Sequence, residues 1–257
     1  MTAKSLFDLT GRVALVTGGS KGLGKAMARA FAEAGANVII SSRHEDELRT
    51  AADEIAAGLP ARAAYVEADV SRRAEAERLA REACEPFGRI DILVNNAGGN
   101  LPQPIDAIVD ADWDRILELN LSSCMVLTRA LVPGMKERRW GRVIHISSIM
   151  ALASKEGRNA YSATKAALIG MARASALELG PFGITVNCLA PGPFLTDLPM
   201  NLLKSDEKQA FADRTALGRW GEPRELAGPA LLLASDAGSY ITGAAIVVDG
   251  GTLARTF

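Results

Sequence analysis

Short apolar runs alternate with longer helical patterns along almost the whole chain, and this alternation limits the possible folds more than any other feature. We expect strands at 13–16, 37–42, 63–67, 90–94, 142–146, 185–189 and 245–248. Helical patterns are expected at 25–34, 73–85, 113–139, 161–179, 198–211 and 224–235. Strands that are apolar throughout must be covered on both faces, so the pattern predicts a parallel sheet between two helical layers. The expected fold class is α/β, with three layers and a mostly parallel, doubly wound, seven-stranded sheet.

Composition and charge are those of an ordinary soluble domain. The 257 residues are 48% hydrophobic and 23% charged, with a formal net charge of -1 at pH 7. This balance does not indicate nucleic acid or an anionic membrane as a partner. The first nine residues show no signal peptide, and no segment approaches the ~20 apolar residues of a membrane span. We therefore expect one domain, 1–257, in the cytoplasm.

Three widely spaced cysteines, Cys84, Cys124 and Cys188, have neither a CxxC pair nor the spacing of a metal site. Free, inert thiols are the expected reading in a reducing compartment. Neither a disulfide framework nor a structural metal is needed, because a chain of this length buries a large core.

The first predicted strand leads into a glycine-rich turn, Thr17-Gly18-Gly19-Ser20-Lys21-Gly22-Leu23-Gly24, and a helix follows that Gly35 closes. Glycines let a backbone approach a phosphate, and the helix N-terminus faces that anion. The spacing is TGxxxGxG and does not match the usual GxGxxG dinucleotide motif. The turn is therefore either a phosphate cradle or a tight strand–helix connection without a ligand.

Residues after the second strand bear on the choice between NAD and NADP. An NAD site usually carries an acid about 20 residues beyond the glycine turn, and Ser42 holds that place here, followed by Arg43. A hydroxyl and a guanidinium would bind a 2′-phosphate, and Lys21 adds a second positive charge. These residues favour NADP over NAD, unless Arg43 is only a surface loop residue. Glu45, Asp46 and Glu47 are expected to begin the next helix.

Several polar or small residues follow the predicted strands directly. They are the glycine turn, Asp69, Asn96, Ser148 and Pro191-Gly192. In doubly wound sheets the ligand lies beyond the carboxyl ends of the strands, where the strand order reverses. We therefore expect these residues to converge on one crevice, although Asn95-Asn96 alone also fits an ordinary turn.

Tyr161 and Lys165 lie four residues apart near the start of a helical pattern, so their side chains share one face. An ammonium near a phenol stabilises phenolate, which suits a general acid/base for alcohols and ketones. A solvated helix face gives the same spacing. Asn120, among apolar neighbours, is either a satisfied core amide or a catalytic one. His145 is expected to be packed in a strand and His44 to lie on the surface. A Ser-His-Asp hydrolase is poorly supported, because the chain has only these two histidines and no GxSxG motif.

In this order, the motifs resemble the short-chain dehydrogenase/reductase family over residues 11–251. They are Thr17-Gly18 with Gly22 and Gly24; Asp69; Asn95 to Gly98; Asn120; Ser148; Tyr161 with Lys165; Pro191-Gly192 with Thr196; and Thr242-Gly243 before Val248 to Gly251. The resemblance implies a Rossmann-like, NADP-preferring oxidoreductase that transfers hydride between nicotinamide and a secondary alcohol or ketone.

The same resemblance implies a role for each matching residue. Tyr161 exchanges the hydroxyl proton, Lys165 assists it and holds the nicotinamide ribose, Ser148 binds the substrate oxygen, and Asn120 holds a water of the proton relay. The implied cofactor-binding residues are Gly18, Ser20, Lys21, Gly22, Leu23, Gly24, Ser42, Arg43, Asp69, Val70, Asn96, Ala97, Gly98, Tyr161, Lys165, Pro191, Gly192, Phe194 and Thr196.

The substrate is left open among 3-oxoacyl, sugar-acid and steroid compounds. A substrate lid is expected at about 195–219, and the resemblance implies a homotetramer that pairs the long helices and the last strand. The candidate lining is Leu101, Met150, Leu152, Leu195, Met200 and Leu203, with Asn100, Lys155 and Arg158 as polar contacts. The alternative is a non-catalytic NADP-binding sensor or scaffold on the same fold.

Overall fold

A computed structural model describes residues 2–196 and 205–254. The strands are β1 (Val13–Thr17), β2 (Asn37–Ser42), β3 (Ala63–Glu67), β4 (Ile92–Asn95), β5 (Gly141–Ile146), β6 (Ile184–Pro191) and β7 (Ala245–Val248). The α-helices are α1 (Ala3–Leu6), α2 (Gly22–Glu33), α3 (Glu45–Ala56), α4 (Arg73–Glu82), α5 (Asp110–Leu117), α6 (Ser123–Arg138), α7 (Asn159–Leu179), α9 (Ser205–Asp213) and α10 (Pro223–Ala234). A π-helical turn, η2 (Glu118–Ser122), joins α5 to α6, and short 3-10 turns lie at η1 (Ile105–Ala107), η3 (Ile149–Ala151), η4 (Gly180–Phe182) and η5 (Asp236–Gly238).

The seven strands form one sheet in the order β3-β2-β1-β4-β5-β6-β7. Every described strand pairing is parallel, which confirms the predicted fold class and makes the sheet wholly rather than mostly parallel. The chain adds β2 and β3 on one side of β1, and after β3 it returns to add β4 and the later strands on the other side of β1. The switch point therefore lies beyond the ends of β1 and β4, where ligands bind in such sheets.

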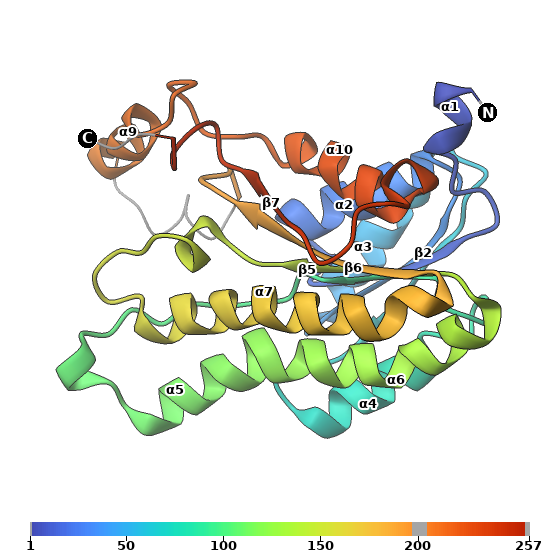
Figure 1. The fold of residues 1–257 in the computed structure, drawn as a ribbon, viewed down its shortest axis with the longest axis horizontal. Coiled ribbons are helices and arrows are strands. Elements are labelled where there is room, and N and C mark those ends of the chain that lie inside the picture. The colour runs from blue at the N-terminus through green and yellow to red at the C-terminus, as the bar shows by residue number, and fades with distance from the viewer. Residues whose placement is uncertain (1, 197–204, 255–257) are drawn as a thin grey trace.

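Alternate residues of each strand face the two helical layers. In β1, Val13 and Leu15 enter a core shared with α4, α6 and α7, whereas Ala14 and Val16 enter a second core shared with α2, α3 and α10. Figure 1 shows these layers on opposite sides of the sheet. Full burial of a large side chain such as Leu15 contributes roughly 1.5–3 kcal/mol, so the continuous apolar strands stabilise both interfaces.

Several element boundaries differ from the sequence expectation by one to three residues. Helix α2 begins at Gly22 rather than Lys25, because the last glycines of the turn already form its first turn. Helix α4 ends at Glu82 rather than Glu85, and β4 begins at Ile92 rather than Ile90. Of the helix expected at 198–211, residues 198–204 lie outside the described part, and α9 covers the remainder.

The long helix expected at 113–139 begins earlier, at Asp110, and its irregular part lies elsewhere. Pro133-Gly134 in the sequence predicts a bend there; α6 continues through Pro133, and the departure from α geometry that the structure shows is the η2 turn at Glu118–Ser122. Pro133 is exposed, so water can reach the backbone carbonyl that its missing N–H leaves unpaired. The helix therefore tolerates this proline.

The stretch Asp110–Arg138 is long and apolar enough to cross a membrane, contrary to the sequence expectation. The sequence expectation counted only unbroken runs of apolar residues. The mean hydropathy of an 18-residue window can be high although polar residues interrupt the apolar ones. Half of the apolar window is buried inside the protein, and buried residues of α6 belong to the core beneath the sheet. The core helix of a globular domain passes the same length and composition test.

Candidate active site

The ends of β1 and β4 are fastened together at the switch point. Thr17 Oγ1 accepts hydrogen bonds from the backbone N–H groups of Asn96 and Ala97, each at 3.0 Å. Asn96 Nδ2 in turn donates to the carbonyls of Thr17 at 2.8 Å and Gly18 at 3.1 Å. Asn96 therefore braces the glycine turn from the neighbouring strand, which an ordinary turn asparagine does not do.

The glycine turn has the shape of a phosphate cradle. Gly18 and Gly22 have φ values of +62° and +52°, a region that side chains disfavour. A Cβ on Gly24 would lie 2.2 Å from the Gly18 carbonyl oxygen, so only glycine fits there. The first residue flanking α2, Lys21, makes no side-chain capping hydrogen bond, which leaves backbone N–H groups of the helix N-terminus for an anion. This arrangement fits a dinucleotide pyrophosphate.

The end of β2 fits a ribose or its 2′-phosphate. The Ser42 hydroxyl is buried and has no hydrogen-bond partner within 2–196 and 205–254, which is costly unless a ligand or water supplies one. Arg43 follows on the surface, close enough to Asp69 for its charge to act on that carboxylate. Burial acts to raise the pKa of Asp69, but hydrogen bonds from Ser71 and the charges of Arg43 and Arg72 outweigh it and hold that pKa below its ordinary value.

Glu47 contacts the glycine turn, although from the sequence it was expected only at the start of a helix. We call the place where Lys21 and Arg43 are expected to bind a 2′-phosphate, with Glu47 and Asp69 beside them, the phosphate corner. Glu47 does lie in the first turn of α3, as expected. Its Oε1 also lies 2.7 Å from Lys21 Nζ, and Ser20 Oγ donates to its Oε2 over a long 3.5 Å. A contact of this kind across 26 residues has no signature in a single sequence.

Tyr161 and Lys165 lie together near the end of β5. Lys165 Nζ is 5.6 Å from the centroid of the Tyr161 ring, and it donates a 2.7 Å hydrogen bond to the Ile146 carbonyl. The lysine is only 4% exposed, whereas a lysine on a solvated helix face would extend into water. Tyr161 and Lys165 are therefore not simply two residues on a solvent-exposed face of α7.

The two serines after β5 have different partners. Ser147 Oγ is buried and donates to the Lys165 carbonyl at 2.7 Å, so its proton is used to hold α7 against β5. Ser148 Oγ accepts from the Met150 N–H at 3.1 Å, which leaves its own proton for another acceptor. Ser148 is therefore the serine whose hydroxyl proton is available to a substrate oxygen.

Asn120 lies in the η2 turn, fully buried. Its Oδ1 accepts from the Gly99 N–H, and its Nδ2 donates to the Gly99 carbonyl, both at 2.9 Å; Nδ2 also reaches Thr164 Oγ1 at 3.2 Å. The amide thus ties the loop after β4 to α7. A Cβ on Gly98 would lie 3.1 Å from Asn120 Oδ1 and 3.4 Å from Lys165 Nζ, so the amide lies close to the active-site lysine as well.

A polar group buried in the sheet lies within the electrostatic reach of Lys165. His145 is fully buried in β5, as expected, and its Nδ1 lies 3.0 Å from Asn95 Nδ2. Burial, with a further contribution from the charge of Lys165, lowers the pKa of His145 to about 4. His145 Nε2 and Asn95 Oδ1 are both buried without a partner among the described residues. The imidazole therefore stays neutral at physiological pH.

The cysteines are free, as predicted from their spacing. Burial raises the pKa of the Cys124 thiol and raises that of Cys188 to about 12, so neither forms a reactive thiolate. Cys84 is partly buried, and burial raises the pKa of its thiol too. Within the described residues, no group of three or more His, Cys, Asp or Glu side chains could hold a metal ion.

The segment after β6 lies against the glycine turn. Thr196 approaches the Cβ position of Gly22 to 3.1 Å, and Gly192 is packed so closely on Asp249 that a Cβ there would lie 2.6 Å from it. The Phe194 ring is buried in the second core beside Gly221. Val70 is likewise buried in the first core. Any cofactor contact of these two residues would therefore involve the backbone more than the side chain.

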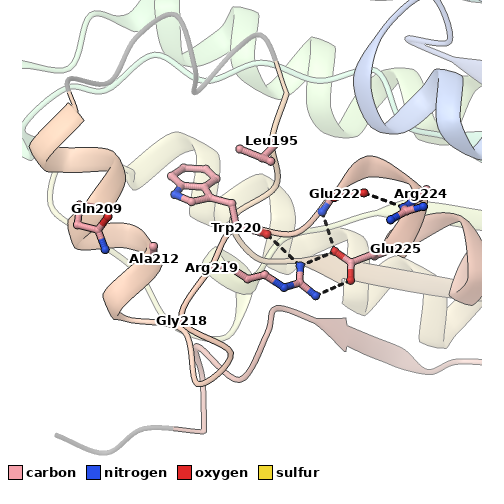
Figure 2. Close-up of a pocket in the computed structure, with 9 residues that line it drawn as sticks. All are labelled: Leu195, Gln209, Ala212, Gly218, Arg219, Trp220, Glu222, Arg224 and Glu225. Carbon is pink, nitrogen blue, oxygen red and sulfur yellow. Dashed lines mark hydrogen bonds and ion pairs between the residues drawn. The ribbon is translucent and has the colours of Figure 1, made fainter.

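A cavity of about 600 Å³ lies between α9, the start of α10 and Leu195 of the segment after β6 (Figure 2). Gln209 and Ala212 of α9 line one side, and Trp220 and Leu195 lie between them and the Arg219–Glu225 pair. Arg219 holds the Glu225 carboxylate with two 2.7 Å hydrogen bonds and, with the Glu222 N–H, lowers its pKa to about 2. Tyr161, Ser148 and Lys165 do not line this cavity, so we do not equate it with the active site.

Comparisons with known proteins place these features in context. A family model described as enoyl-(acyl carrier protein) reductase matches residues 18–252. The 3-oxoacyl-[acyl-carrier-protein] reductase FabG of Aquifex aeolicus is 37% identical over 243 residues, covering 95% of this chain and 98% of the relative. The 3-alpha-(or 20-beta)-hydroxysteroid dehydrogenase of Mycobacterium bovis is 41% identical over 246 residues, covering 96% and 91%. A crystal structure of a gluconate 5-dehydrogenase from Burkholderia cenocepacia, in complex with NADP and tartrate, has a TM-score of 0.93 at 34% identity and covers 99% of this chain and 100% of that chain.

Proposed function

This chain belongs to the short-chain dehydrogenase/reductase family of oxidoreductases, and from that premise we propose that it reduces a ketone to a secondary alcohol with NADPH. The observation that carries the proposal is the meeting of the phosphate cradle with the Tyr161–Lys165 pair and Ser148 at one edge of the sheet. The same site would also run the reverse oxidation.

In this proposal, Tyr161 donates its phenolic proton to the ketone oxygen as general acid. The free proton of Ser148 makes a second hydrogen bond to that oxygen and orients it. Lys165, held by the Ile146 carbonyl, keeps a positive charge beside the phenol. Asn120 holds the loop after β4 against α7 and so keeps the side chains of Tyr161 and Lys165 in a fixed position relative to that loop. A bound nicotinamide would supply the hydride that the substrate carbon accepts.

The cofactor would lie along the residues that the sequence analysis named. The cradle Gly18–Gly24 would hold the pyrophosphate, with Ser42, Lys21 and Arg43 around the 2′-phosphate and Asp69 near the adenine. Asn96 to Gly98 would line the ribose side, and Pro191, Gly192 and Thr196 would follow toward the nicotinamide. The orphaned Ser42 hydroxyl supports the preference for NADP over NAD.

The proposed substrate is a 3-oxoacyl, sugar-acid or related carbonyl compound. Leu101, Leu152 and Leu195 are exposed apolar residues of the candidate lining, whereas Met200 and Leu203 lie outside the described residues. Asn100 Oδ1 is buried without a partner among the described residues and could accept a substrate hydroxyl. We propose the lid at about 195–219, of which 197–204 lie outside the described residues; it is supported by Phe211 of α9, whose ring lies 5.7 Å from Nζ of Lys155, one of the candidate polar contacts.

A nucleotide titration followed by a substrate screen tests this proposal. We expect NADPH to quench or shift protein fluorescence at lower concentration than NADH, and NADPH to be consumed with at least one 3-oxoacyl thioester or keto sugar acid. Tight NADPH binding without turnover on any ketone of the panel would favour the non-catalytic sensor or scaffold. Binding of neither nucleotide would contradict the cradle assignment itself.

We also propose a homotetramer in the cytoplasm. Leu177 on α7 is 83% exposed, and Val247 on the edge strand β7 is exposed as well, on the two elements that the family resemblance assigns to subunit contacts. Leu177→Glu should therefore lower the mass that light scattering measures after size exclusion, because it places a charge in an apolar contact. A monomeric wild-type protein would contradict the tetramer.

A further inference from the structure

The two cations expected to bind a 2′-phosphate each have a carboxylate close to them. Glu47 Oε1 contacts Lys21 Nζ at 2.7 Å, and this hydrogen bond is the main cause that lowers the pKa of Glu47. Arg43 acts electrostatically on Asp69, which is partly buried. The four formal charges cancel. Arg72, whose Nε lies 3.9 Å from Asp69 Oδ2, adds one positive charge, so the phosphate corner has only a small net positive charge to attract a phosphate.

We propose that Glu47 sets how strongly this protein discriminates NADPH from NADH, because its carboxylate competes with the 2′-phosphate for Lys21. The inference rests on the proposed cofactor. NADH carries a neutral hydroxyl at that position and has no charge for which Glu47 could compete. Glu47 is thus a specificity-determining residue outside the glycine turn and outside the segment after β2.

The contact is more than a brace between two helices. Lys25 of α2 already pairs with Glu54 of α3, about one turn beyond Lys21 and about two turns beyond Glu47. Glu47 instead contacts residues of the turn itself, Lys21 and Ser20. Its side chain is about one third exposed, so a change there leaves the core intact. An isosteric replacement should therefore alter the charge balance without altering the fold.

The test compares Glu47→Gln with wild type in fluorescence titrations with NADPH and NADH at low ionic strength. We expect NADPH to bind at least about fivefold more tightly to the variant and NADH to change by less than about twofold. The gain for NADPH should shrink in high salt, because exposed charges are screened there. Competition by 2′,5′-ADP should follow NADPH, and competition by 5′-AMP should follow NADH.

Three further variants distinguish an effect of Glu47 on Lys21 from a general effect of removing a surface carboxylate. Glu54→Gln removes the matched carboxylate of the Lys25 pair and should leave the ratio of the two dissociation constants unchanged. Lys21→Ala in the Glu47→Gln background should abolish the gain, because the effect acts through Lys21. Arg43→Ala in wild type should weaken NADPH more than NADH.

Equal tightening of both nucleotides, or an unchanged ratio in Glu47→Gln, would overturn the inference while the proposed function stands. If wild type binds neither nucleotide, the proposed function fails at that earlier step and the inference fails with it.

Discussion

Tyr161→Phe should reduce turnover by roughly 10²–10⁴-fold, the contribution expected of a positioned general acid. The substitution removes only the phenolic oxygen. The ring remains, partly buried, with the Lys165 ammonium beside it. The dissociation constant for NADPH should therefore stay within about twofold of wild type. Steady-state NADPH oxidation and a fluorescence titration on the same preparation measure the two effects.

Tyr240→Phe is the matched control for this experiment. Tyr240 is fully exposed, so losing its hydroxyl should leave both turnover and nucleotide binding unchanged. Retained activity in Tyr161→Phe would show that another group supplies the proton. Loss of nucleotide binding together with turnover would show that the phenol supports the cofactor rather than the chemistry.

The sheet and its candidate site could be predicted because both depend on local patterns. Apolar runs such as 37–42 and 63–67 match the observed strands β2 and β3 residue for residue. Polar residues that directly follow such strands must lie at one edge of a parallel sheet. Thr17, Gly18 and Asn96 accordingly meet there through direct hydrogen bonds.

Contacts between distant segments could not be predicted in the same way. The Glu47–Lys21 pair depends on how α3 packs beside the glycine turn, and no spacing rule encodes that packing. The η2 turn at Asn120 was also missed, since Pro133 is the residue that usually signals an irregular helix. Thr17 was named only as the first residue of the glycine turn, and its hydrogen bonds to the backbone of Asn96 and Ala97 were not predicted.

His145 should make the protein less stable in mild acid. In an unfolded chain the imidazole takes up a proton near its ordinary pKa of 6.5, whereas in the fold that pKa is lowered to about 4. Between these values the unfolded state binds more protons, so falling pH favours unfolding. The full difference corresponds to ~3 kcal/mol of unfolding free energy. Stability is therefore fully present above about pH 6.5 and is progressively lost toward about pH 4.

Urea unfolding at about pH 7 and about pH 4.5, at one protein concentration, measures this loss. His145→Gln keeps an acceptor for Asn95 but cannot titrate, so its unfolding free energy should fall by ~2 kcal/mol less than that of wild type over this interval. His44→Gln removes the exposed imidazole and controls for the loss of a histidine as such. Parallel pH dependence in wild type and His145→Gln would mean that the folded protein accommodates a charged imidazole next to Lys165. The buried, unpartnered Nε2 argues against that outcome, because a proton added to this ring would gain no new acceptor among the described residues.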